Sequence, residues 1–144
     1  MAQGESVLFA AALIFWGLEA AVAPEHSVAS VINECWKGRD HAGMSACVAG
    51  RADEAKASLR RAEQAVADRV SASTDEPGFP RYRADALSTL DRASHAFAKY
   101  VDTECRYQAA LATKGNGSED VRQACIAVLN EERAQWIRAT KPVG

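Results

Sequence analysis

Four cysteines are the residues of this chain best placed to do chemistry, and their spacing groups them into two pairs. Cys35 and Cys47 are 12 residues apart, and Cys105 and Cys125 are 20 residues apart. The chain has no Cys-x-x-Cys pair, and its three histidines do not stand at ligand spacings, so the sequence does not predict a zinc site. Four cysteines that all pair as disulfides would leave no free thiol to act as a nucleophile.

Neighbouring acidic residues are the other groups that could do chemistry, as general acids or bases. They stand at Asp102/Glu104, Glu119/Asp120 and Glu131/Glu132. Adjacent acids on a helix usually form a solvated face or an N-terminal cap, and we interpret these in that way. The glycines at 115–117 are sufficiently explained as a turn between helices, rather than as a phosphate-binding loop. We therefore expect no catalytic residue, no metal and no cofactor.

An apolar segment, Val7–Leu18, lies near the start of the chain. At ~1.5 Å per residue it spans roughly 18 Å, which is shorter than a bilayer core of ~30 Å, so it fits a signal peptide. Small-x-small cleavage patterns end at Ala23 and at Ala29. We expect residues 1–29 to be a signal peptide or, alternatively, an uncleaved N-terminal anchor, and residues 30–144 to form one domain. Export would place the chain in the periplasm or cell envelope, where disulfides form.

The charge of the expected mature domain is close to neutral. Residues 1–29 contain three of the 19 acidic residues and no Lys or Arg, so 17 basic and 16 acidic residues remain. Nucleic-acid binding usually needs a strongly basic face, so we expect no nucleic-acid partner. Contact with a membrane is expected only through an uncleaved leader.

Hydrophobic residues after the leader recur at spacings of three and four, which predicts helices. The expected helices cover Val28–Trp36, residues 48–70, Tyr82 to Thr113, and Ser118 to just before Pro142. Prolines and a glycine within 71–80, and glycines at 115–117, should separate the three longer helices. Ser118 is expected to cap the last helix. No segment alternates with a period of two residues, so we expect no strand.

The cysteines fit an antiparallel arrangement of these helices. Cys105 lies 8 residues before Thr113 and Cys125 lies 7 after Ser118, which places them roughly 12 and 10 Å from the turn along the two axes. Cys35 and Cys47 could close the segment between them. Four cysteines allow three pairings, among which sequence alone does not decide. We favour 35–47 with 105–125. The expected fold is all-α, with three main antiparallel helices and a short N-terminal helix, stapled by two disulfides.

Three large side chains are expected to have structural roles. Trp36 and Trp136 are interpreted as core anchors rather than as platforms for a ligand. His95 lies beside the hydrophobic stripe of the second main helix, and we expect it to be a half-buried packing residue.

An ordered set of landmarks begins at Cys35, and the resemblance that it carries extends to about Arg138. The landmarks are Cys35, then Met44-Ser45-Ala46-Cys47, then Ala52-Asp53 with Leu59, then Leu90–Cys105, then a glycine-rich turn, then Cys125–Arg133. Leu90–Cys105 is similar to the pattern Leu-x-x-Ala-Gln-x-x-Trp-x-x-(Tyr/Phe)-Arg-Asp-x-x-Cys, with Ser94, Phe97 and Val101 in place of its Gln, Trp and Arg. Together these landmarks resemble the lysozyme inhibitor LprI-like N-terminal domain family, whose members are small exported bacterial helical domains.

The resemblance implies a non-enzymatic binding protein that inhibits lysozyme or a related peptidoglycan-cleaving enzyme. Such an inhibitor would block a cleft lined by two carboxylates, and a protruding loop with a basic or hydrogen-bonding tip would do this. The best local candidate is Trp36–Ala46, which a disulfide would pre-organise. Its candidate partner-binding residues are Trp36, Lys37, Arg39, Asp40 and His41.

Other interpretations stay open at this point. Trp36–Ala46 would also serve as a plain structural loop. The whole chain could be a structural or stress-related envelope domain that binds another envelope protein, or an enzyme with an unrecognised site.

Overall fold

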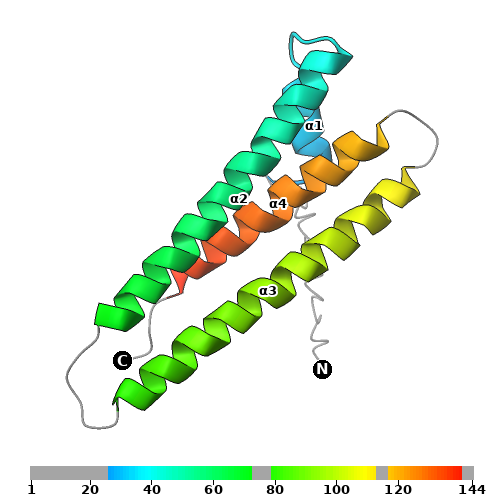
Figure 1. The fold of residues 1–144 in the computed structure, drawn as a ribbon. Coiled ribbons are helices and arrows are strands. Elements are labelled where there is room, and N and C mark those ends of the chain that lie inside the picture. Colours follow the sequence, from blue (N-terminus) through cyan, green and yellow to red (C-terminus); the bar gives the residue numbers. More distant parts are fainter. Residues whose placement is uncertain (1–25, 73–78, 113–116, 141–144) are drawn as a thin grey trace, which may run out of the picture.

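The computed structural model describes residues 26–72, 79–112 and 117–140, and this part of the chain is built from four helices (Figure 1). The helices are α1 (Val28–Trp36), α2 (His41–Ala72), α3 (Phe79–Leu111) and α4 (Ser118–Ala139). No strand occurs among the described residues, so the all-α prediction is confirmed. The expected leader as far as residue 25, and the centre of the expected 115–117 turn, lie outside them. None of the described helices is both long and apolar enough to cross a membrane.

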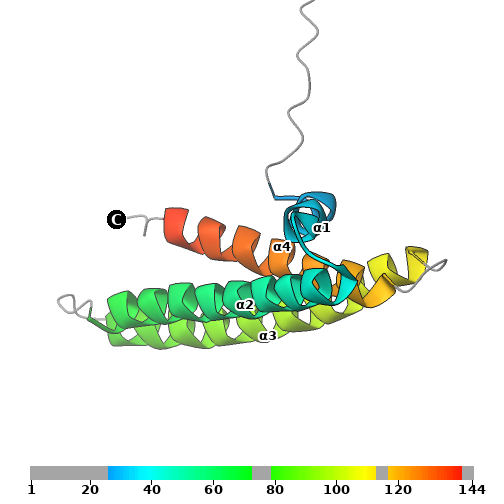
Figure 2. The ribbon, with the colours of Figure 1, turned by 90° about the horizontal axis from the view of Figure 1, so that it is seen from above.

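Helix α4 is the element that holds the others together. It packs against all three other helices, most extensively against α2, whereas α1 contacts only α2 and α4. Figure 1 shows α4 running between α2 and α3, and Figure 2 shows α1 beside α4, on the side away from α3. The α2–α4 interface is therefore the main core, and α3 is joined to it along one edge.

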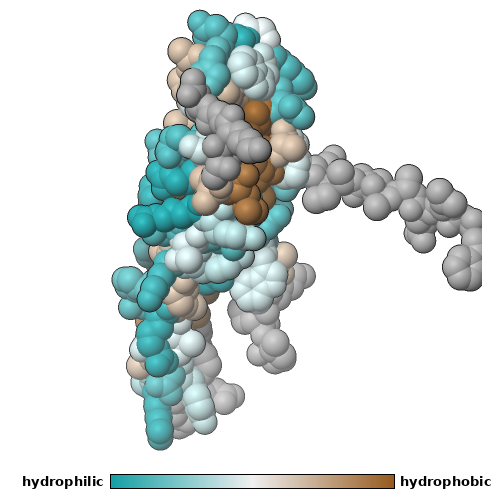
Figure 3. Space-filling view, turned by 90° about the vertical axis from the view of Figure 1, so that its right-hand side faces the viewer, coloured by the Kyte–Doolittle hydropathy of each residue, from teal (hydrophilic) through white to brown (hydrophobic). Residues whose placement is uncertain are grey.

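The core is built largely from alanine and other small residues. Ala52, Ala124 and Ala134 are fully buried, and Val48 is the largest residue of α2 that is fully buried. The hydrophobic residues spaced by three and four along α2 are buried at Val48, Ala52, Ala55, Leu59 and Ala62. The last two of that row, Val66 and Val70, are only half-buried. Small side chains let two helices approach closely, but each removes little apolar area from water. Figure 3 shows one compact hydrophobic area on a face that is otherwise mostly hydrophilic or intermediate.

Two disulfides reinforce this thin core, with the pairing that the sequence favours. Cys35 is bonded to Cys47, and Cys105 to Cys125. Cys105 and Cys125 are 0% and 1% exposed, so the bond from α3 to α4 lies inside the core. Small domains with little apolar burial commonly depend on such cross-links.

Both interpreted core anchors turn out to be on the surface. Trp36 is 42% exposed and Trp136 is 64% exposed. On α4 the core face is occupied by Ala134 and Ile137, so the two residues between them, Gln135 and Trp136, point outward. The same holds for Trp36, because its neighbour Cys35 is the residue that turns inward. An interface lined by alanine leaves no space for an indole ring.

The prediction for His95 was also wrong. Its side chain is 80% exposed, with Nδ1 3.6 Å from an oxygen of the Asp91 carboxylate and 3.0 Å from the Asp91 carbonyl oxygen. The preceding residue, Ser94, faces α2, where it donates to Glu63. A step of one residue rotates a helix by about 100°, which carries His95 out of the interface.

Helix boundaries differ from the predictions mainly at their starts. Helix α2 begins at His41 rather than at residue 48, and α3 begins at Phe79, with Pro80 in the first turn, where proline is tolerated. The N-cap of α4 is Gly117, without a side-chain capping bond, so Ser118 is the first helical residue and not the cap. Hydrogen bonds from Arg122, and then from Gln123, lower the pKa of Glu119 in that first turn.

Helix α1 begins with a reciprocal capping box. The Ser27 hydroxyl oxygen accepts the Ser30 amide at 3.1 Å, and the Ser30 hydroxyl oxygen accepts the Ser27 amide at 2.9 Å. We expect a chain that starts at Ser30 to unfold with a free energy roughly 0.5–2 kcal/mol lower than one that starts at Pro24. Urea unfolding of the two chains measures the difference.

A point substitution separates the cap from chain length. Ser27→Ala in the longer chain should reproduce the part of the loss that comes from the cap, because the shorter chain also lacks Val28, which packs against the core. Ser88→Ala on the exposed side of α3 should have no such effect. Equal stability of the chains that start at Pro24 and at Ser30 would show that the capping box contributes nothing.

A polar cluster joins the three long helices. Glu63 on α2 accepts a hydrogen bond from the Ser94 hydroxyl of α3 at 2.7 Å, and the same oxygen lies 3.8 Å from Nε of Arg133 on α4. The Arg133 guanidinium also lies 4.8 Å from the centre of the Phe97 ring. The Glu63 and Arg133 side chains are only 19% and 18% exposed, so water hydrates neither charge well. Each charge is therefore stabilised mainly by the other.

We expect Glu63→Ala to lower the free energy of unfolding by about 1–3 kcal/mol, because Arg133 and Ser94 both lose a partner. The matched control is Asp53→Ala, which breaks the 3.2 Å pair with Lys56 at a side chain that is 78% exposed. That control should change stability by no more than about 0.5 kcal/mol. Equal losses in urea unfolding would contradict the role given to this cluster.

Candidate functional site

The expected loop between the first two cysteines is shorter in the structure than in the prediction. Only Lys37–Asp40 lie outside the helices, and the segment from His41 to Ala46 forms the first turns of α2. Gly38 has φ +69°, a left-handed conformation that glycine adopts without steric cost. The chain therefore reverses direction within four residues between α1 and α2.

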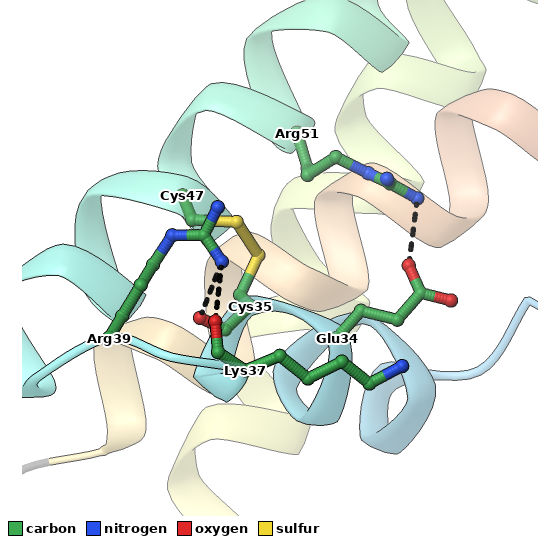
Figure 4. The surroundings of a disulfide bond; sticks show 6 residues. All are labelled: Glu34, Cys35, Lys37, Arg39, Cys47 and Arg51. Atoms are coloured by element: carbon green, nitrogen blue, oxygen red, sulfur yellow. Dashed lines mark hydrogen bonds and ion pairs between the residues drawn. A yellow bond between two sulfur atoms is a disulfide. The ribbon is translucent and has the colours of Figure 1, made fainter.

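The Cys35–Cys47 disulfide closes this connection by joining α1 to α2 (Figure 4). Cys35 lies near the end of α1 and Cys47 in the second turn of α2, with their Cα atoms 5.6 Å apart. Every residue from Trp36 to His41 is exposed, although both helices on either side contribute buried residues. The result is a short surface projection on a rigid base, as a pre-organised binding loop requires.

Two of the five candidate residues are engaged in holding the loop itself. The Arg39 guanidinium donates from Nη1 to the carbonyl oxygens of Cys35 and Lys37, both at 3.3 Å. This contact places a positive charge at the C-terminal end of α1, where it is favourable. The Asp40 carboxylate accepts the Gly43 amide at 2.8 Å, as an N-cap residue does. Arg39 and Asp40 thus have structural roles in the described loop.

Trp36 and His41 form an aromatic pair across the connection. Their ring centres are 5.9 Å apart in an edge-on arrangement. On its other side, Nε2 of His41 lies 3.6 Å from the carboxylate of Asp120, a residue of α4 that is only 6% exposed. His41 therefore links the exposed indole to the first turn of α4, which limits the positions that the indole can take.

Lys37 is the candidate residue whose side chain is least engaged. It caps α1 only through its backbone amide, which donates to the Glu34 carbonyl at 3.3 Å. Figure 4 shows its side chain extended away from the disulfide. Among the described residues no ion pair involves its ammonium group, whereas nearby Arg51 lies 3.6 Å from Glu34. The projection thus offers an aromatic surface at Trp36 and an available cation at Lys37.

Sequence reasoning missed a cavity of about 360 Å³ between the start of α1 and the α2–α4 groove. Its lining is His26, Val31, Arg51, Glu54, Ala55, Ser58, Arg61, Ala127, Val128, Glu131 and Gln135. These residues come from three segments far apart in the chain, and no local motif connects them. In the described part of the chain, no group of three His, Cys, Asp or Glu side chains is arranged to hold a metal ion.

Comparison with known families gives one match that covers most of the chain. A family model described as Lysozyme inhibitor LprI matches residues 35–137. The matched range begins at the first cysteine and contains all four, together with the exposed connection between α1 and α2. Neither a curated protein nor a solved structure matches the chain.

Proposed function

Because the chain belongs to the lysozyme inhibitor LprI family, we propose that it is an exported, non-enzymatic protein that inhibits lysozyme or a related peptidoglycan-cleaving enzyme. The match over residues 35–137 is the observation that carries this proposal. The two disulfides support export, because such bonds persist in oxidising compartments and are rare in the cytosol.

The connection between α1 and α2 is the proposed inhibitory surface. Lysozyme-type enzymes cleave their substrate between two carboxyl groups in an open cleft. In the proposed complex the Lys37 ammonium approaches those carboxyl groups, and the Trp36 ring covers the adjacent apolar wall of the cleft. Exposed tryptophan is enriched among residues that dominate binding energy. Arg39, Asp40 and His41 would act indirectly, by holding these two side chains in place.

The disulfide beneath the connection has a specific role in this proposal. A flexible loop would lose conformational freedom on entering a cleft, and that loss would weaken binding. The Cys35–Cys47 bond, the Arg39 contacts and the Asp40 cap remove most of that freedom before binding. Inhibition should therefore depend on the bond even where the fold survives without it.

The start of α1 limits where the leader can be cleaved without damage to the helix. A signal peptide that ended at Ala29 would remove Ser27 and the first two residues of the helix. We therefore propose that the leader is cleaved before Ser27, or is retained as an anchor. N-terminal sequencing of the exported protein tests this, and a mature chain that begins at Ser30 would contradict it.

The inhibitor proposal is tested by lysis of a peptidoglycan substrate in the presence of the oxidised protein. Lysozymes of more than one structural type should be assayed, because the family name alone does not define the target enzyme. Dose-dependent inhibition of at least one type is the expected result. Lysis at an unchanged rate with every type, at a large molar excess of the protein, would leave binding to another envelope protein as the better explanation.

A further inference from the structure

Helix α3 is long, but few of its side chains are buried. It has 33 residues, and among its described side chains only Val101 and Cys105 are buried. None of the described side chains from Pro80 to Tyr100 is buried. Long helices in water owe most of their stability to packing of an apolar face, so this helix has a large surface available for a partner.

One face of α3 carries a continuous row of uncharged side chains, which we call the α3 seam. It consists of Tyr82, Ala86, Thr89, Ala93, Ala96, Tyr100, Thr103, Tyr107 and Ala110. All nine are exposed, and their spacing alternates between four and three residues. This is the heptad spacing by which one helix packs along another.

The composition of the α3 seam fits a protein surface better than a lipid surface. Tyr82, Tyr100 and Tyr107 are 71%, 51% and 58% exposed, and tyrosine is enriched at protein interfaces. The alanines between them let a second backbone approach closely. Thr89 and Thr103 interrupt the apolar character that insertion into a membrane would need.

A row of cations borders the α3 seam on its free side. The residues immediately before Ala93, Tyr100 and Tyr107 are Arg92, Lys99 and Arg106, and all three are exposed. Arg106 is paired with Asp102, and Arg92 donates to the Thr89 hydroxyl, whereas no described ion pair involves Lys99. Two exposed acids also precede seam residues, Asp85 before Ala86 and Asp102 before Thr103, so among the described residues the unpaired positive charge of this flank lies at Arg92 and Lys99.

We propose that the α3 seam binds an amphipathic α-helix of another protein, with acidic residues at seven-residue intervals along one flank. The heptad spacing of the seam fits the side-chain spacing of another helix. The cations beside the seam favour a partner with negative charge on its flank. A second copy of this chain fits less well, since antiparallel pairing through the middle of the seam would bring Arg92 of each copy toward Lys99 of the other. Helix α1 makes no contact with α3, so this surface is separate from the proposed inhibitory one.

Two labelled synthetic helical peptides test the proposal directly. Both have a leucine and alanine seam at heptad spacing, one with glutamate and the other with lysine along its flank. Fluorescence anisotropy with the full chain should show that the glutamate peptide binds at least about tenfold more tightly than the lysine peptide. Raising the salt concentration should weaken binding of the glutamate peptide, because the flanking charges are exposed.

Variants of the α3 flank and seam sharpen this test. Arg92→Glu combined with Lys99→Glu should reverse the preference between the two peptides, an outcome that loss of folding cannot produce. The control is Arg60→Glu on the exposed surface of α2, which should leave the preference unchanged. Tyr100→Glu should abolish binding of both peptides while the circular dichroism spectrum stays helical.

Several results would overturn the proposal. Equal binding of the two peptides, or no binding of either, would remove the acidic helix as the partner. Sedimentation that shows a dimer dissociated by Tyr100→Glu would assign the seam to a second copy of the chain. Binding to anionic lipid vesicles that Tyr100→Glu abolishes would assign it to a membrane surface. None of these results bears on inhibition of lysozyme.

Discussion

Replacing Cys105 and Cys125 together by alanine is expected to lower the free energy of unfolding by about 3 kcal/mol. The bond closes a loop of 20 residues between α3 and α4, and opening that loop restores conformational freedom to the unfolded chain. The loss falls on a helix with little other anchorage, because Val101 is the only other buried residue among the described side chains of α3. Urea unfolding followed by circular dichroism measures the change.

Amide hydrogen exchange locates the effect within the molecule. In this variant, exchange should accelerate in α3, while the α2–α4 interface keeps most of its protection. The comparison variant, with Cys35 and Cys47 replaced by alanine, should accelerate exchange in α1 and at the start of α2. A loss of less than about 1 kcal/mol, or a uniform rise in exchange over all four helices, would contradict the view that α3 depends on its disulfide.

Trp36→Ala should weaken inhibition about 30-fold or more, which corresponds to a loss of about 2 kcal/mol of binding free energy. The chain supplies a matched control in Trp136→Ala, because Trp136 is an even more exposed tryptophan on α4, outside the proposed inhibitory surface. Both substitutions should leave the fold intact, since neither ring belongs to the core clusters. The concentration for half-maximal inhibition of lysis measures both variants.

Lys37→Ala separates the charge of the loop from its aromatic surface. In concentrated salt we expect Lys37→Ala to weaken inhibition less than Trp36→Ala does. In dilute salt the effect of Lys37→Ala should be larger, because salt screens an exposed ammonium group. Equal effects of Trp36→Ala and Trp136→Ala would show that the inhibitory surface lies elsewhere on the molecule.

The sequence predicted those parts of the fold that depend on periodicity and spacing. The bounds of α1 are those expected, and both disulfides are paired as favoured, because Cys105 and Cys125 stand at matching distances from one turn. The errors concern the direction of side chains. Trp136, beside Ala134 and Ile137, could not be assigned to the surface until the core face of α4 was known. Gly117, and not Ser118 as expected, is the N-cap of α4. Sequence preferences could not predict this, because serine is favoured over glycine at that position.

The candidate site was predicted in part. The exposed position of Trp36–His41 between two cysteines follows from sequence. The contacts that decide which of these residues hold the loop and which are available to a partner do not. Arg39 bonds to backbone carbonyls two and four residues before it, which its exposed position does not reveal in advance. His41 approaches Asp120, a residue 79 positions away, and that contact leaves no local pattern. The α3 seam is visible in the sequence as a heptad row. Its exposure could not be predicted, because a buried helix face would show the same spacing.

Inhibition of lysozyme by the oxidised chain, compared with its Cys35→Ala/Cys47→Ala variant, tests the proposed inhibitor function and its loop most directly. Circular dichroism first confirms that the variant remains folded at the assay temperature. We expect the oxidised chain to inhibit lysis in proportion to its concentration, and the folded variant to inhibit at least about tenfold less well, because its loop is no longer pre-organised. Equal inhibition by the two proteins would contradict the proposed loop, and lysis at an unchanged rate with both would contradict the inhibitor function itself.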